Sequence, residues 1–478
     1  MADDVRHGCP ECAKRDRRIA ELEKRLNKLE ADLAKAKKHS GNSSKPPSSD
    51  IVNPKKAAPP GNKSAENPGQ TKGKRGGQAG HQRHLRKPFE PDEIDVTWIH
   101  YYTGCPCCGG KLVEADEPVK ILQQVELEAL PFRVEEHQRA AQQCTKCHTV
   151  HCVPWPDDLK KAGLVGPRLT ALIGYLKGGC HMSFSAIRKF LRDVVKITIS
   201  RGQLAKLVAK VADSLLSPYE QLLALLPKED RLNVDETGHK ENGKRLWTWC
   251  FRASLYTVFK ISPSRASKVL VEVLGKEFDG VLGCDYFSAY RKFMKDFNVT
   301  IQFCLAHFIR DVKFLAEHPN KKNRQHGELL LGHLRQLFHI IRRRDDYATE
   351  AGFRRALGRV RNNLVDDAIF QSPGTREADN LGDRFLNHFE SFFTFITTPG
   401  IEPTNNLAEQ AIRFVAIHRR MTQGTRSEGG RSWCERIWTA VATCGQQGRS
   451  LFEYLCETVG NTFHSRPVPP LIELSDTS

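Results

Sequence analysis

The stretch RLNVDET, residues 231–237, begins a run of short segments that are rich in β-branched and aromatic residues. KRLWTWCFRA (244–253) and LYTVFKIS (255–262) follow, and turn signals such as ENG (241–243) separate them. Such runs predict three β-strands. The chain then alternates, with helices expected at 264–275, 287–297 and 305–318 and strands at 280–286 and 299–304. Three strands followed by alternating helices and strands predict a mixed α/β sheet.

Two aspartates are expected at the ends of buried, apolar strands of this predicted sheet: Asp235 in LNVDET and Asp285 in GVLGCDY. A carboxylate at such a position is costly unless ligands meet it. If the two strands are adjacent, the carboxylates lie close together and need a cation between them. Oxygen ligands favour Mg²⁺ or Mn²⁺, and a pair of such ions can promote an in-line attack on phosphorus. The predicted third ligand is Glu409, in EPTNNLAEQAIR (402–413).

Each of these acids also has a purely structural explanation. Asp235 could be a turn residue, and Asp285 could cap the helix that follows it. Glu236 is the adjacent alternative to Asp235, although strand alternation sends its side chain to the other face. The alternatives to Glu409 as the third ligand are Glu402, Glu428 and Glu435. The joint pattern on a basic chain favours the catalytic interpretation.

Glu409 also fits a capping box, because it lies three residues after Asn406 at an expected helix start. Asn405 or Asn406 could instead cap the helix through its own side chain, which would free Glu409 to bind a metal ion. Arg413 lies one turn later on the same face, where it could hold that carboxylate or meet a phosphate.

The composition favours a polyanionic partner. The 478 residues include 73 Lys and Arg against 56 Asp and Glu, a formal net charge of +17. Such an excess points first to nucleic acid. No apolar run approaches the length of a spanning helix, and the start, MADDVRHGCPEC, lacks the apolar core of a secretory signal. We therefore expect a cytosolic protein whose 15 cysteines are thiols or metal ligands.

Two CxxC pairs predict a structural zinc site. They flank a strand-rich segment of the kind found in four-cysteine zinc ribbons, and the predicted ligands are Cys105, Cys108, Cys144 and Cys147. A further pair, Cys9 and Cys12, is a half-site that the same pair of another chain could complete. An unmetallated turn explains that pair equally well.

An amphipathic helix is expected from residue 13 to about 38, with an apolar stripe of Ile19, Leu22, Leu26, Leu29 and Leu33. Self-association through this stripe is favoured over a helix lying on the protein surface, because SGNSSKPPSSD (40–50) and the residues after it cannot bury a core. The linker ends in KGKRGGQAGHQRHLRKP (72–88), which is either a solvated charge run or an arm along DNA phosphates.

Residues 157–228 are expected to be helical, and a helix beginning after Ser200 follows a short helix and a tight turn. This arrangement is similar to a helix-turn-helix, although a plain helical bundle explains the pattern nearly as well. If the segment is a helix-turn-helix, the residues that would contact DNA are Ser200, Arg201, Gln203 and Lys206.

Taken together, the motifs resemble those of the insertion sequence 66 family of bacterial transposases over nearly the full length. The matching pieces are SGNSSKPPSSD, KRGGQAGHQRH, CPCCGG, FSAIRKFLRDVVKITISRGQL, VDETG, SPSRAS, CDYFSAYRKF, CLAHFIRD and EPTNNLAEQAIR. The resemblance implies an RNase H-like catalytic domain in which Asp235, Asp285 and Glu409 bind Mg²⁺ (or Mn²⁺), two ions per active site. The supporting residues expected near them are Cys304, His307, Arg310 and Arg413.

The resemblance implies a DDE transposase. It would bind the terminal inverted repeats of an insertion sequence, nick the ends by hydrolysis and use the freed 3′-hydroxyl to attack target DNA. The expected partners are double-stranded DNA, at least one further copy of the chain and accessory proteins of the element, but no membrane, and the expected place is the nucleoid in the bacterial cytoplasm. The alternatives are an RNase H-like nuclease without strand transfer and an inactive zinc-dependent DNA-binding regulator.

The predicted architecture is a multidomain α/β protein. Its parts are a CxxC motif with a leucine-zipper-like helix or coiled coil (1–40), a disordered basic linker (41–90), a zinc ribbon (91–155), a helical DNA-binding domain (156–229), an RNase H-like core (230–318), a helical insertion (319–400), the second part of the core (401–450) and a C-terminal tail (451–478).

Overall fold

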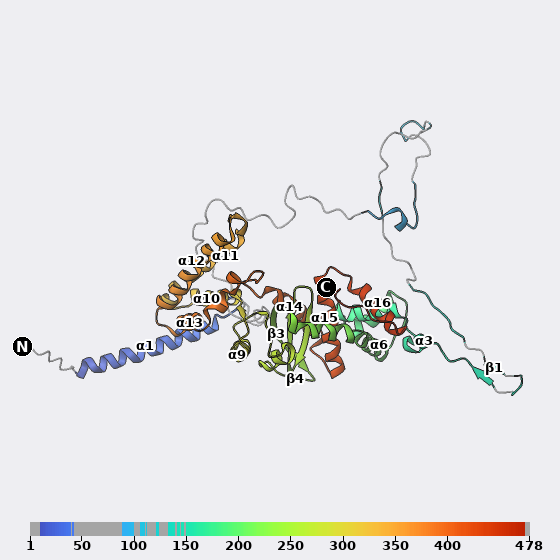
Figure 1. Cartoon of the computed structure of the whole chain (residues 1–478), viewed down its shortest axis with the longest axis horizontal. Coiled ribbons are helices and arrows are strands. Elements are labelled where there is room, and N and C mark those ends of the chain that lie inside the picture. Colours follow the sequence, from blue (N-terminus) through green and yellow to red (C-terminus); the bar gives the residue numbers. More distant parts are fainter. Residues whose placement is uncertain are drawn as a thin grey trace, which may run out of the picture. The chain divides into compact units, whose positions relative to one another are not determined.

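The computed structural model describes residues 10–39, 41–42, 88–99, 106–109, 111, 121–123, 132–138, 141–143, 145–147 and 150–473. The described residues form a five-stranded sheet with the strand order β5-β4-β3-β6-β7. Its strands β3 and β4 are labelled in Figure 1. The strands are β3 (Arg231–Glu241), β4 (Lys244–Arg252), β5 (Thr257–Ser262), β6 (Val281–Cys284) and β7 (Ile301–Phe303). Because β3, β4 and β5 are antiparallel while β6 and β7 run parallel to β3, the predicted mixed sheet is confirmed.

The central strand β3 is longer than the sequence indicates. It continues past Asp235, which pairs with Cys250 of β4, so the prediction that Asp235 ends its strand is wrong. The turn follows at Asn242 and Gly243, whose φ angles of 48° and 79° suit a two-residue hairpin. Asp285 does follow the last residue of β6, as expected.

Five helices accompany the sheet: α8 (Lys268–Leu274), α9 (Ser288–Phe297), α10 (Leu305–Ala316), α14 (Asn406–Thr422) and α15 (Glu428–Gln446). Helix α15 lies along β5, where the hydroxyl of Thr439 accepts a hydrogen bond from the backbone N–H of Phe259 at 3.1 Å. Thr443 does the same for Thr257 at 3.2 Å. These contacts cover an edge strand whose backbone groups would otherwise be unpaired.

The expected helical insertion forms α11 (Lys321–Arg342), α12 (Glu350–Phe370) and α13 (Arg376–Thr397). The end of α13 covers the other edge of the sheet. There the Thr394 hydroxyl donates to the carbonyl oxygen of Ile301 at 2.7 Å, and the Gln302 side chain accepts from the backbone of Phe395 at 2.9 Å. The insertion therefore protects strand β7.

A second helical group packs beside the sheet domain and comprises α3 (Asp157–Ala162), α4 (Pro167–Gly178), α5 (Phe184–Asp193), α6 (Arg201–Ser214), α7 (Leu216–Leu225) and α16 (Leu451–Phe463). Helix α16 lies in the segment expected to be a C-terminal tail. It packs on α4, where the rings of Tyr175 and Phe452 meet edge to face with centroids 5.9 Å apart. The C-terminal segment thus completes the helical group.

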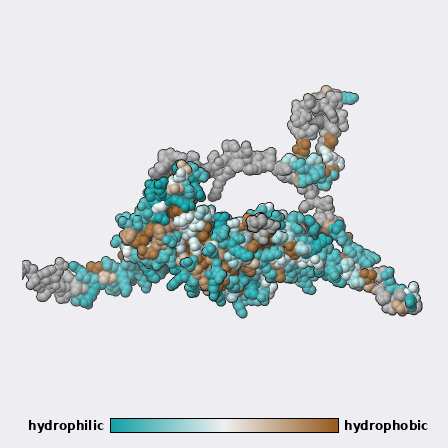
Figure 2. All heavy atoms as spheres, in the orientation of Figure 1, coloured by the Kyte–Doolittle hydropathy of each residue, from teal (hydrophilic) through white to brown (hydrophobic). Residues whose placement is uncertain are grey.

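The N-terminal helix α1 (Pro10–Ala36) confirms the expected helix. Its stripe residues Ile19, Leu22, Leu26, Leu29 and Leu33 are between 47 and 59% exposed, and apolar atoms interrupt the otherwise hydrophilic surface of the helix in the space-filling view (Figure 2). Self-association of the stripe stays a prediction. In the part of the chain that the structure describes, no helix is long and apolar enough to cross a membrane.

Candidate active site

The two aspartates lie at equivalent positions on neighbouring strands. Asn233 of β3 is paired with Gly283 of β6, and Asp235 and Asp285 each lie two residues further along their strands. Side chains two residues apart share a face, so both carboxylates project from the face that carries Asn233. Gly283 leaves room for the Asn233 side chain, because a Cβ there would lie 2.6 Å from its nitrogen.

The helix that carries Glu409 is fixed to the same face of β3 at its first turn. Asn405, which is only 1% exposed, accepts a hydrogen bond from the Asn233 side chain at 2.9 Å. Its own amide donates to the carbonyl oxygen of Val234 at 2.8 Å. Because Asn405 binds the strand, it makes no capping hydrogen bond to α14, and no side-chain cap is present at that helix start. The prediction that an asparagine side chain caps this helix is therefore wrong.

The far end of α14 is fixed to β3 as well. The Arg419 guanidinium donates to the Thr237 hydroxyl at 3.1 Å. Beyond the helix, the backbone N–H of Thr425 donates to the carbonyl oxygen of Lys240 at 2.9 Å. With contacts at both ends, α14 lies along β3, and the charge of Glu409 in its first turn acts on both aspartates by raising their pKa values.

The Glu409 carboxylate, 23% exposed, is held by residues of α10. Arg310 donates to its Oε2 at 2.8 Å, and Nδ1 of His307 lies 3.4 Å from its Oε1. Cys304 accepts a hydrogen bond from the backbone N–H of Asn405 at 3.1 Å, so the start of α10 also touches the start of α14. The structure thus brings Cys304, His307 and Arg310 together with Glu409. Arg413 instead is exposed and forms no hydrogen bond or ion pair among the described residues.

The alternatives to Glu409 lie elsewhere. Glu435 belongs to α15 and accepts the backbone N–H of Ile261 on β5 at 2.6 Å. Glu428 is exposed and pairs with Arg431 at 3.2 Å, and Glu402 is exposed. Of the four glutamates, Glu409 alone is held over the strands that carry the two aspartates.

The electrostatics of the site are unfavourable without a cation. Burial and the charges of Glu236, Asp285 and Glu409 raise the pKa of Asp235 well above its ordinary value. Burial, followed by the charge of Glu236, raises the pKa of Asp285 to about 7, although a backbone hydrogen bond from Phe287 opposes the shift. No lysine or arginine of the described segments forms an ion pair with either aspartate. The carboxylates therefore repel one another.

The donor atoms fit a divalent cation. Oε1 of Glu409 and Nδ1 of His307 are both buried, and neither has a hydrogen-bond partner in the part of the chain that the structure describes. The two atoms lie 3.4 Å from each other without forming a hydrogen bond, and a ligand shared between them would satisfy both. Cys304, His307 and Glu409 offer ligand atoms within 4.8 Å of one another. Among the described residues this is the group of such side chains whose ligand atoms lie that close together, and it includes Glu409 but neither aspartate. Carboxylate oxygens are the donors that Mg²⁺ and Mn²⁺ prefer.

The sequence profile described as "Transposase IS66 family" matches residues 162–432, which include the whole sheet and all three acids. The chain belongs to this family. Three relatives from Sinorhizobium fredii (strain NBRC 101917 / NGR234) are similar to it. The proteins y4hP, y4qI and y4jD, each described as uncharacterized, are 26%, 25% and 23% identical over 76%, 64% and 66% of this chain and 71%, 61% and 66% of their own lengths. Family membership indicates a transposase, which acts on DNA. DDE-type transposases generally use a divalent metal ion.

Asn405 is expected to determine both the stability and the activity of this IS66 family protein. Asn405→Ala leaves the carbonyl oxygen of Val234 and the amide of Asn233 without partners, at a cost of about 1–3 kcal/mol per buried group. We expect a lower melting temperature and slower DNA cleavage. The matched control is Asn406→Ala, because Asn406 is exposed and its side chain makes no hydrogen bond in the described structure. Equal melting temperatures for the two variants would contradict the role assigned to Asn405.

The residues expected to contact DNA lie at the start of α6. The Ser200 hydroxyl accepts the backbone N–H of Gln203 at 3.1 Å, which confirms the predicted N-cap. Arg201 and Lys206 are exposed, while Gln203 is half-buried. Contact of this helix with DNA stays a prediction.

The cysteine predictions fall partly outside the described residues, which exclude Cys9, Cys105 and Cys144 and the side chain of Cys12. Residues 145–147 form a turn between β1 (Ala141–Gln143) and β2 (Val150–Cys152), which pair in antiparallel fashion. A hairpin of this kind is typical of a zinc knuckle. Cys108 and Cys147 are exposed. The four-cysteine zinc site and the N-terminal half-site stay predictions.

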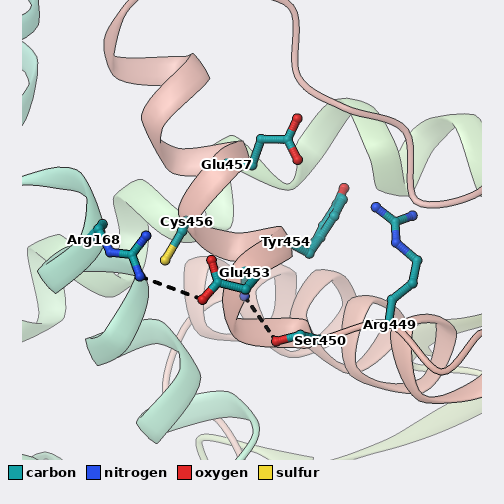
Figure 3. Close-up of a pocket in the computed structure, with 7 residues that line it drawn as sticks. All are labelled: Arg168, Arg449, Ser450, Glu453, Tyr454, Cys456 and Glu457. Carbon is teal, nitrogen blue, oxygen red and sulfur yellow. Dashed lines mark hydrogen bonds and ion pairs between the residues drawn. The ribbon is translucent and has the colours of Figure 1, made fainter. Parts of the chain in front are cut away.

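A surface pocket lies apart from the acids, on α4 and α16 (Figure 3). Its lining residues are Arg168, Arg449, Ser450, Glu453, Tyr454, Cys456 and Glu457. Arg168 is paired with Glu453 at 3.6 Å, and Ser450 caps α16 by accepting the backbone N–H of Glu453. These side chains therefore serve the contact between two helices, and the pocket contains none of the three acids.

Proposed function

We propose that the chain is a DDE transposase that binds the terminal inverted repeats of its insertion sequence, cleaves the 3′ ends and joins them to target DNA. The single observation that supports this best is the position of the helix that carries Glu409, whose start two hydrogen bonds of Asn405 hold on β3, the strand of Asp235. Three acids from distant parts of the sequence that share metal ions would be typical of metal-dependent phosphoryl transfer.

The three carboxylates would hold divalent ions, which supply charge stabilisation to the attacking and the leaving oxygen in this class of reaction. Arg310 and His307 orient the Glu409 carboxylate. The Phe287 N–H, which donates to Asp285 at 3.0 Å, fixes the second acid. In the first reaction water attacks the phosphorus at the end of the element and the 3′-oxygen leaves. In the second the new 3′-hydroxyl attacks a phosphorus of target DNA, and a target 3′-oxygen leaves.

The basic surface of the chain supports DNA as substrate. The formal net charge is +17, and the exposed side chains of Arg201 and Lys206 flank the first turn of α6, where they could contact DNA. We further propose that Cys105, Cys108, Cys144 and Cys147 bind a structural zinc ion, because the second pair borders a β-hairpin. Dimerisation through the exposed stripe of α1 would bring two element ends together.

A joining assay tests the proposed function. The purified protein is incubated with Mg²⁺, a supercoiled target plasmid and a duplex that carries the sequence flanking its gene, labelled at the 5′ end of the strand whose 3′-hydroxyl is to be freed. A transposase transfers the label to the plasmid, whereas a nuclease releases cleaved ends without transfer. Absence of both products, under conditions in which the protein binds the duplex, would contradict the proposal and favour a regulator.

A further inference from the structure

The glutamate next to Asp235 has its own buried set of hydrogen-bond partners. The side chain of Glu236 is only 1% exposed and projects from the face of β3 opposite Asp235. Its Oε2 accepts the Tyr290 hydroxyl at 2.5 Å. Its Oε1 accepts both Nε and Nη2 of Arg265, at 2.8 and 2.6 Å. A buried carboxylate with three charge-assisted or short hydrogen bonds is held in a single geometry.

Arg265 is held on its other sides by aromatic rings. Its guanidinium lies 3.8 Å from the ring centre of Phe287 and 4.5 Å from that of Trp247. Two stacked rings and a shared carboxylate fix a side chain that would otherwise lose considerable rotamer entropy on binding a ligand. Arg265 is therefore preorganised before any substrate arrives.

The guanidinium nevertheless keeps one edge for a ligand. Glu236 uses Nε and Nη2, the side edge of the fork, and leaves the end edge made by Nη1 and the second hydrogen of Nη2. Nη1 forms no hydrogen bond or ion pair with any residue that the structure describes. The side chain of Arg265 is 37% exposed, so this edge reaches solvent. A planar pair of N–H donors matches two oxygens of a phosphate.

The free edge of the Arg265 guanidinium lies near Asp285. Phe287, which stacks on Arg265, donates its backbone N–H to Asp285 at 3.0 Å. The positive charge of Arg265 lowers the pKa of Asp285 and so opposes the effect of Glu236. If the only role of Arg265 were to pair with the buried Glu236, its guanidinium would not need to reach the surface. A fully buried cation would neutralise that carboxylate at least as well.

We propose that Arg265 binds a backbone phosphate of the DNA strand next to the scissile bond, and that Glu236 and Tyr290 are positioning residues that aim its guanidinium. This inference rests on the proposed function, since it assigns a substrate contact to the same site. Arg265 reaches the phosphate from the β4 and α9 side of the sheet, while Arg310 stays with Glu409 on the α14 side.

Salt-dependent DNA binding tests the contact without relying on cleavage. Affinity for the labelled flanking duplex is measured at several salt concentrations, with Ca²⁺ as the divalent ion. Each phosphate contact contributes a slope of about −0.9 to the plot of log affinity against log salt, so Arg265→Gln is expected to reduce the slope by about one unit. The matched control is Lys268→Gln, which removes a nearby exposed positive charge and should leave the slope unchanged.

The positioning residues are tested by cleavage. Glu236→Gln and Tyr290→Phe keep the guanidinium, so the salt slope should stay as in the wild type while kcat falls by about tenfold or more. Arg265→Lys keeps the charge but not the paired donors, and it should retain the slope yet cleave as slowly as Arg265→Gln. If Arg265→Gln leaves Glu236 buried and unpaired and does not fold, the double variant Glu236→Gln with Arg265→Gln removes both charges and gives the same slope comparison.

An unchanged slope in the folded Arg265→Gln protein, or an equal change in Lys268→Gln, would overturn the inference. Wild-type protein that binds but never cleaves would refute the proposed function instead, and the slope would still decide whether Arg265 contacts phosphate.

Discussion

Replacing Asp285 with asparagine is expected to abolish DNA cleavage and to stabilise the metal-free protein at alkaline pH. The folded state holds the pKa of Asp285 at about 7, against an ordinary value of 3.8. The folded protein therefore binds more protons than the unfolded chain between these values, and stability falls as the pH rises through that window. Above it the ionised group costs about 4 kcal/mol, which asparagine avoids.

Thermal unfolding in EDTA at about pH 5 and about pH 8 measures this effect. Asp285→Asn should raise the melting temperature at the higher pH and have little effect at the lower one. Cleavage should fall by about a thousandfold or more, because a ligand of the metal is lost. The control is Asp279→Asn, which removes an exposed carboxylate just before β6. A variant that retains cleavage, or one that is destabilised at both pH values, would contradict the assignment of Asp285.

Mg²⁺ is expected to stabilise the wild-type protein, and Glu409→Gln is expected to remove most of that effect. An ion that binds only the folded state at about a hundred times its Kd contributes about 2.7 kcal/mol. Melting curves recorded across a Mg²⁺ titration give the apparent affinity of each variant. Glu402→Gln is the matched control, because Glu402 is an exposed glutamate in the segment just before α14.

The same titration has a predicted pH dependence. Binding of Mg²⁺ must displace the proton from Asp285, whose pKa is about 7. Affinity should therefore rise by at least about tenfold per pH unit below that value, and more steeply wherever Asp235, whose pKa is also raised, must give up a proton. Stabilisation of Glu409→Gln equal to that of the wild type would show that the ion binds elsewhere.

Much of the fold could be predicted from local patterns. Alternating β-branched and aromatic residues marked the strands, and Asp235 and Asp285 were singled out because carboxylates in apolar strands are costly. The extent of β3 was missed, because Asp235 was expected to end the strand, whereas pairing with β4 keeps the chain extended as far as Glu241. Local propensity cannot anticipate such pairing across the sheet.

The contacts that assemble the site were harder to predict because their partners are distant in sequence. Asn405 was expected to cap its own helix, but two hydrogen bonds to β3 use the side chain instead. Arg413 was expected near Glu409 from helical spacing, yet Arg310 from α10 holds that carboxylate. Glu236 was set aside as facing away from the metal, and sequence gave no indication of its partners Arg265 and Tyr290.

A change of metal preference tests most directly whether Asp235, Asp285 and Glu409 form one metal-dependent cleavage centre. Mg²⁺ binds thiolates poorly, whereas Mn²⁺ accepts softer ligands more readily. Asp285→Cys should therefore cleave the flanking duplex very slowly with Mg²⁺ and recover substantial activity with Mn²⁺, while the wild type cleaves with both ions. Cleavage by Asp285→Cys that is as fast with Mg²⁺ as in the wild type, or equally absent with both ions, would contradict a metal-binding role for Asp285.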